Sequence, residues 1–120
     1  MSSEQVVRDM LAAWKRFDID ELVSYFTEDA VYDNVPRYPV YGRDCIRKLL
    51  EELKPHMTEI DYVITKLGAF GDYVTTERLD YFHFDGKPCE LPVMGAFEIR
   101  DGRISAWRDY YDRQQSGAGV

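Results

Sequence analysis

Two carboxylates and an arginine stand where strands are expected, and together they could carry acid–base chemistry. Arg78 and Asp80 lie two residues apart in the run 73–84, which is rich in Val, Thr, Tyr and Phe and is typical of a β-strand. Strand side chains alternate between faces, so both charges share a face with Val74 and Phe82. Charges on an apolar face are costly unless they are paired. The pattern therefore indicates a structural ion pair, a solvated sheet face or a functional site.

A second carboxylate stands on the last predicted strand. Asp109 shares a face with Trp107 and Tyr111, again among aromatic side chains. If both strands turn these faces inward, Arg78 can bond to Asp80 and Asp109 at once, as the planar guanidinium allows. One carboxylate can then stay ionised and act as a base while the other is kept neutral and acts as an acid.

Two polar residues could complete such a site. Tyr32 and Asn34 share a face of the predicted strand 30–34 and could hold a water beside the carboxylates. They could equally be ordinary strand and turn residues, because Asn is common before turns. The sequence offers no Ser or Cys nucleophile with a His base and no glycine-rich phosphate loop. His56 and His83 are far apart without ligand spacing, so we expect no metal site.

Composition bounds the class of protein. With 120 residues, we expect one domain over 1–120. Hydrophobic residues make up 45% and aromatic residues 14%, enough for a core and for aromatic walls around a cavity. The net charge of −7 argues against binding to nucleic acid or to an anionic membrane surface.

Targeting signals are not expected. The first residues lack the basic and apolar regions of a signal peptide, and no apolar run approaches the roughly 18 residues of a membrane span. Cys45 and Cys89 form no CxxC motif and do not indicate a disulfide framework. These features predict a reduced, cytoplasmic setting.

Hydrophobic periodicity and turn residues predict an α+β fold. Helices are expected over 3–17, 20–26 (capped by Asp20) and 43–53. Strands are expected over 30–34, 58–67, 73–84, 89–100 and 103–111, with a proline-containing loop over 35–41 and a frayed end over 114–120. Asp85-Gly86 and Asp101-Gly102 are strong hairpin signals. Helices followed by an antiparallel meander favour a sheet of about five strands that wraps around the helices and leaves a pocket.

Four segments carry a resemblance to a known family. They are 31–36 (VYDNVP), 41–44 (YGRD), 76–80 (TERLD) and 106–112 (AWRDYYD). In order and spacing the chain resembles the limonene-1,2-epoxide hydrolase family, within the nuclear transport factor 2-like (NTF2-like) superfamily that also holds ketosteroid isomerase-like and SnoaL-like proteins. The resemblance covers nearly the whole chain. It implies an NTF2-like cone, a curved mixed or antiparallel sheet around N-terminal helices with an internal pocket.

The resemblance also implies roles for the polar residues. Asp109 matches the general base that activates water, and Asp80 matches the acid that protonates the epoxide oxygen. Arg78 matches the residue that bridges the two carboxylates. Tyr32 and Asn34 match the other ligands of the water. No cofactor is implied.

The resemblance further implies a set of substrate-binding residues on the pocket wall. They are Leu11, Trp14, Leu53, Met57, Phe82, Leu91, Val93, Trp107 and Tyr111. Trp14 and Tyr111 are bulkier or more polar than an aliphatic terpene pocket requires, and Arg37 and Tyr38 also depart from the expected pattern.

These observations predict cofactor-independent hydrolysis of a small hydrophobic epoxide to a vicinal diol. An isomerase or cyclase acting next to a carbonyl is the second hypothesis, and a non-catalytic pocket for a hydrophobic ligand is the third. Arg78 between two carboxylates suits water activation better than enolisation. A homodimer is also expected, because an outward strand face is apolar and would be exposed on a monomer. That face comprises Met94, Ala96, Ala106 and Tyr110.

Overall fold

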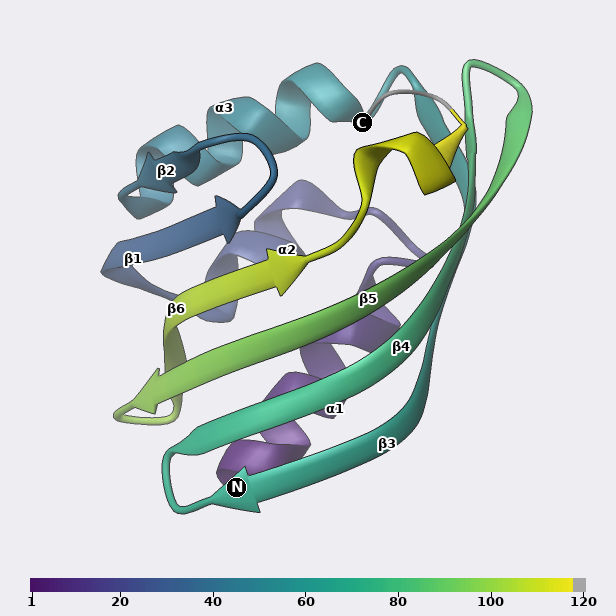
Figure 1. Cartoon of the computed structure of the whole chain (residues 1–120). Helices are drawn as coiled ribbons and strands as arrows, with labels where there is room; N and C mark the ends of the chain where they lie inside the picture. The colour runs from purple at the N-terminus through teal and green to yellow at the C-terminus, as the bar shows by residue number, and fades with distance from the viewer. Residues whose placement is uncertain (118–120) are drawn as a thin grey trace.

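A curved six-stranded sheet wraps around the N-terminal helices in the computed structural model, which describes residues 1–117 (Figure 1). The helices are α1 (Ser3–Ala13), α2 (Ile19–Ser24), α3 (Arg43–Leu53) and the short 3₁₀ helix η1 (Arg113–Ser116). The strands are β1 (Phe26–Asn34), β2 (Pro39–Tyr41), β3 (Met57–Phe70), β4 (Tyr73–Phe84), β5 (Lys87–Arg100) and β6 (Arg103–Tyr110). The predicted α+β class is confirmed.

The strand order places the first strand beside the last strand. The order is β2-β1-β6-β5-β4-β3, and β1 runs parallel to β6 while all other neighbours are antiparallel. Along the parallel pair Tyr32 lies opposite Trp107 and Asn34 lies opposite Asp109. The sheet is therefore mixed, and β6 places its polar residues beside those of β1.

Helix α1 packs its apolar stripe into the concave side of the sheet. Ser2 caps it by accepting a hydrogen bond from the Gln5 N–H, and Val7 and Met10 are fully buried. The helix ends at Ala13, so the predicted extension to Phe17 is wrong. The next residues form single hydrogen-bonded turns, and Phe17 itself has a φ of 43°, which a continuing helix cannot contain.

The second helix and the strand after it also begin earlier than predicted. Asp18, not Asp20, caps α2 by accepting a hydrogen bond from the Glu21 N–H. The helix stops at Ser24, and β1 starts at Phe26 instead of residue 30. Phe26 is buried and pairs with Ile104 of β6. This pairing keeps the chain in the sheet although the residues after Phe26 are polar.

Part of the predicted loop over 35–41 is strand β2. It pairs with β1 at the edge of the sheet, where Pro39 is tolerated because its missing N–H leaves no central hydrogen bond unmade. Residues 113–116 form η1 rather than a frayed end, with the Asp112 side chain as cap. The rest of the predicted frayed segment, 118–120, lies outside the described residues.

The two predicted Asp-Gly hairpins are confirmed. Asp85 and Asp101 have φ values of 51° and 53°, and the glycines after them also have positive φ, as two-residue turns of this kind require. The turns fix the register of β4, β5 and β6. No helix in residues 1–117 is long and apolar enough to cross a membrane.

Candidate active site

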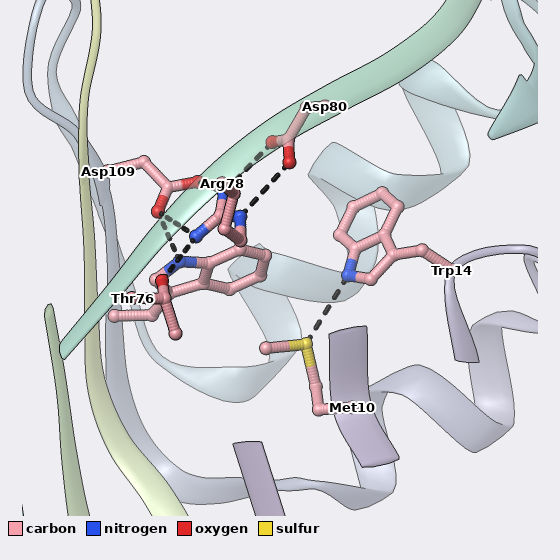
Figure 2. Close-up of polar contacts among 7 residues, drawn as sticks. Met10, Trp14, Thr76, Arg78, Asp80 and Asp109 are labelled. Atoms are coloured by element: carbon pink, nitrogen blue, oxygen red, sulfur yellow. Dashed lines mark hydrogen bonds and ion pairs between the residues drawn. The ribbon is translucent and has the colours of Figure 1, made fainter. Parts of the chain in front are cut away.

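Arg78 lies between two carboxylates and bonds to both, as Figure 2 shows. Its Nε donates to Asp80 Oδ1 at 3.0 Å and its Nη2 to Asp80 Oδ2 at 2.9 Å. Nη1 donates to Asp109 Oδ1 at 3.1 Å, and Nη2 donates to Asp109 Oδ2 at 2.8 Å. The Arg78 side chain is 0% exposed and each carboxylate side chain is 7% exposed. The predicted convergence of these three residues is thus present in the structure.

Two further side chains hold this cluster in place. Thr76 Oγ1 accepts the remaining Nη1 hydrogen of Arg78 at 3.1 Å, so all five guanidinium donors are used. Trp107 Nε1 donates to Asp109 Oδ1 at 2.7 Å. The arginine and Asp109 are therefore fixed by hydrogen bonds, and neither can rotate without breaking several of them.

The alternation of β4 explains why these residues meet. Val74, Thr76, Arg78, Asp80 and Phe82 are all buried, and the residues between them face outward. The apolar residues at the two ends of this face anchor it in the core. The charged residues in the middle are consequently held inside the sheet.

Gly95 makes room for the cluster on the strand between β4 and β6. It lies opposite Thr76 on one side and Asp109 on the other. A Cβ at this position would lie 2.5 Å from Nη1 of Arg78, 2.8 Å from Oγ1 of Thr76 and 3.0 Å from Oδ1 of Asp109. Only glycine leaves space for the guanidinium, although the backbone there is ordinary strand. Sequence reasoning missed this residue; a glycine inside a strand pattern was the available signal.

Replacing Gly95 with Ala should therefore damage the site more than the fold. We expect a stability loss of about 1–3 kcal/mol from overpacking and a much larger loss of any activity that depends on the cluster. Urea unfolding and steady-state rates measure the two effects. Gly68→Ala on β3 is the control, because its new Cβ would meet no atom closer than 3.3 Å. Parent-like activity in Gly95→Ala would show that the space that Gly95 leaves for the Arg78 guanidinium is not needed.

The two carboxylates stand in different electrostatic environments. Burial raises the pKa of Asp80 above its usual value, Arg78 opposes this rise by its hydrogen bonds and charge, and the charge of Asp109 adds to it. Because the carboxylates share one arginine, their titrations are coupled. The raised pKa favours the neutral form of Asp80.

Tyr32 and Asn34 lie beside Asp109. The Tyr32 ring stacks on Trp107 with centroids 4.2 Å apart, and Asn34 lines the cavity together with Tyr32 and Asp109. Burial first, and then the charge of Asp109, raises the pKa of Tyr32 well above its usual value, so the hydroxyl stays neutral. A phenol and an amide thus lie next to a carboxylate, which is a suitable environment for a water molecule.

These groups open on a cavity of about 270 Å³. Asp80, Asp109, Tyr32 and Asn34 line it, and Arg78 is not part of the lining. The arginine therefore contacts the carboxylates from behind, while the carboxylates face the cavity. Apolar side chains dominate the rest of the wall, as is typical of a pocket for a small molecule.

Comparison with known proteins identifies the family. A model described as the limonene-1,2-epoxide hydrolase catalytic domain matches residues 1–116. The chain belongs to the limonene-1,2-epoxide hydrolase family. The predicted resemblance is confirmed, and the chain is an epoxide hydrolase in the general sense that the family defines.

Two epoxide hydrolases agree with this assignment, and a more distant structure shares the fold. The chain is 33% identical over 106 residues to the epoxide hydrolase EphG of Mycobacterium tuberculosis, covering 88% of this chain and 70% of that protein. It is 30% identical to the solved structure of an M. tuberculosis LEH-like epoxide hydrolase, with a TM-score of 0.87 and coverage of 98% and 88%. A putative SnoaL-like polyketide cyclase from Shewanella putrefaciens has a TM-score of 0.86 at 16% identity, covering 96% and 93%, and shows the fold alone.

Most of the wall residues implied by the family do line the cavity. They are Trp14, Leu53, Met57, Phe82, Leu91, Val93 and Tyr111. Leu11 and Trp107 are not among the lining residues: each is 1% exposed and belongs to the core. Leu11 packs on the buried face of α1, and Trp107 lies behind Tyr32 and donates to Asp109. Trp107 is thus a support for the carboxylate rather than part of the wall.

The cavity has further lining residues that the sequence did not reveal. They are Arg37, Tyr38, Val40, Leu49, Glu52, Tyr62 and Phe84. The departures at Arg37 and Tyr38 were visible in the sequence, but their place at the cavity was not. The place of Phe84 at the cavity could have been predicted from the alternation of β4. The orientation of Tyr62 toward the cavity depends on an irregularity of β3 and could not.

Proposed function

We propose that this chain hydrolyses a small hydrophobic epoxide to a vicinal diol, without a cofactor and by direct attack of water. The observation that carries the proposal is the buried Arg78, which bonds to two carboxylates at the wall of an apolar cavity, one of which also accepts from Trp107. A pair of carboxylates in different environments is the arrangement that acid–base catalysis needs. The names of the relatives support the same reaction class.

The reaction divides between the two carboxylates. Asp109 takes a proton from a water held by Tyr32 and Asn34, and the water oxygen forms a bond to one epoxide carbon. The bond from that carbon to the epoxide oxygen breaks, and Asp80 gives its proton to the oxygen. The product is a diol, and the proton gained by Asp109 is later returned to Asp80, so the pair is restored. Arg78 keeps its charge and its contacts throughout.

A panel of epoxides tests the proposal directly. We expect diol from at least one small hydrophobic epoxide, measured by chromatography, with no added metal or cofactor. In a single turnover in heavy-oxygen water, the label should appear in the diol at once. Label that enters the protein first, together with unlabelled diol, would mean an aspartate ester and would refute direct attack. Absence of diol, with turnover of a carbonyl compound instead, would favour the isomerase or cyclase hypothesis.

We also propose a homodimer. Met94 and Tyr110 pair across β5 and β6 on the face away from the cavity and are 50% and 49% exposed. Ala106 on the same face is half-buried, and Ala96, now seen to be 7% exposed, is already covered within the chain. The exposed pair remains an apolar surface that a second copy would cover.

Sedimentation should then show a particle of twice the chain mass. Met94→Glu should shift the equilibrium toward monomer, because it places a charge in the contact. Glu90→Gln, on the same outward face, serves as the control. A parent protein that stays monomeric at high concentration would rule out the dimer.

A further inference from the structure

Tyr62 brings an additional hydroxyl to the reacting end of the cavity. It lies on β3 directly opposite Asp80 of β4, and it lines the cavity together with Asp80 and Trp14. Directly opposed residues in an antiparallel pair have their Cβ atoms about 4.5–5.5 Å apart. Tyr62 and the proposed acid are therefore immediate neighbours on the same wall.

The Tyr62 ring is held by two neighbouring side chains that contact the ring rather than the hydroxyl. The Arg78 guanidinium lies 5.8 Å from the ring centroid, and the Trp14 ring lies 5.4 Å from it at an angle of 43°. Both contacts involve the ring alone and would be kept by phenylalanine. Packing therefore explains why an aromatic residue is present, but it does not explain the oxygen.

The hydroxyl has an unmet hydrogen bond. Among residues 1–117, no side chain or backbone group forms a hydrogen bond with the Tyr62 oxygen. In the same residues, every fully buried side-chain oxygen or nitrogen has a hydrogen-bond partner, so an oxygen without one cannot be fully buried. The Tyr62 oxygen is consequently open to the cavity. A polar group in such a site gains a partner when a ligand with an acceptor enters.

The charge state of Tyr62 suits donation. Burial first, and then the negative charge of Asp80, raises the pKa of Tyr62 well above the usual value, while Arg78 acts in the opposite direction. The Tyr62 phenol therefore stays neutral at physiological pH and keeps its hydrogen. The phenol can therefore donate to a substrate oxygen beside Asp80, which Arg78 holds in place through both of its oxygens.

We propose that the Tyr62 hydroxyl donates a hydrogen bond to the epoxide oxygen that Asp80 protonates, which makes Tyr62 a further catalytic residue. This inference rests on the proposed function. As the carbon–oxygen bond breaks, negative charge grows on that oxygen, and a fixed neutral donor stabilises it more than it stabilises the bound epoxide. Asp80 still supplies the proton, and the phenol only shares the developing charge until the proton arrives.

Tyr62→Phe isolates the hydroxyl, because the ring contacts with Arg78 and Trp14 remain. We expect kcat to fall on the order of 10- to 100-fold and KM to rise only about threefold, since the bond is stronger in the transition state than in the bound epoxide. The thermal midpoint should stay close to that of the parent, because no protein hydrogen bond is lost. Tyr81→Phe is the matched control: it removes a hydroxyl from the next residue of β4 on the outward face.

The outcomes separate this inference from the proposed function. If Tyr62→Phe turns over every epoxide at the parent rate while Asp80→Asn is inactive, the role of Tyr62 is refuted and the hydrolase mechanism stands. A rate loss equal in Tyr81→Phe and Tyr62→Phe would also refute it, because the effect would not be local to the cavity.

A binding measurement keeps the test decisive if the parent hydrolyses no epoxide. Calorimetry with cyclohexene oxide, in the Asp109→Asn background in which bound epoxide is not consumed, should give a Kd about threefold weaker when Tyr62→Phe is added. Equal Kd values would overturn the inference even where the proposed function had failed.

Discussion

Replacing Asp109 with Asn should almost abolish turnover: we expect kcat to fall on the order of 10²–10⁴-fold with the fold intact. The amide has nearly the shape of the carboxylate, and its oxygen can still accept the hydrogen bond from Trp107. It cannot take a proton from water. Asp80→Asn should be as damaging for the opposite reason, because its amide has no acidic proton to give to the epoxide oxygen. Steady-state kinetics and thermal melting measure the two properties.

The pH profile identifies which carboxylate is the acid. Because the pKa of Asp80 is raised, its proton persists to higher pH than on a free aspartate, and the rate should fall as pH rises through that pKa. Acid should lower the rate too, since it protonates the base. Asp112→Asn, which alters an aspartate that lies outside the cavity lining, is the control. A folded Asp109→Asn variant with nearly the parent rate would reduce the carboxylate pair to a structural ion network.

Changes at Arg78 should separate charge from geometry. Arg78→Met would leave two carboxylates buried without a cation, and breaking such a buried pair costs about 3–5 kcal/mol. Arg78→Lys keeps the charge, so it should fold more stably than Arg78→Met. It should still lose most activity, on the order of 10²-fold or more, because an ammonium cannot reach both carboxylates with paired donors.

Urea unfolding and kcat of the two variants check this order. Arg108→Lys is the matched control, since Arg108 is on β6 of the same sheet, faces outward and pairs with Glu98 at 2.7 Å. An Arg78→Lys variant with parent activity would show that only the positive charge matters. Equal stability of Arg78→Met and the parent would show that the carboxylates tolerate burial without the arginine.

Much of the site was visible in the sequence because strand alternation is a local property. Arg78 and Asp80 two residues apart must share a face, and Asp109 with its aromatic neighbours must do the same. The two Asp-Gly turns then fixed which strands are neighbours. What no local pattern contains is the parallel pairing of β1 with β6, which the structure reveals and which places Asn34 opposite Asp109.

The features that were missed depend on irregular or crowded backbone. In β3 the register shifts between Thr58 and Asp61, and Glu59 has a φ of 53°. Counting in steps of two from Met57 therefore points Asp61 inward, whereas the bulge turns Tyr62 inward instead. Gly95 was missed for a different reason: its role is the space that three side chains from other strands need, which only the assembled sheet reveals.

The pairing of Asn34 with Asp109 has a consequence for how the protein is made. Strands β3, β4 and β5 are joined by short turns and can pair as soon as they leave the ribosome, so Arg78 and Asp80 meet early. In the sheet, β6 lies between β1 and β5, and it is the last strand to be synthesised. When β6 pairs with β1, it closes a long loop of chain. Until then Arg78 has only one of its two carboxylates, so we expect the site to be completed only after β6 has been made.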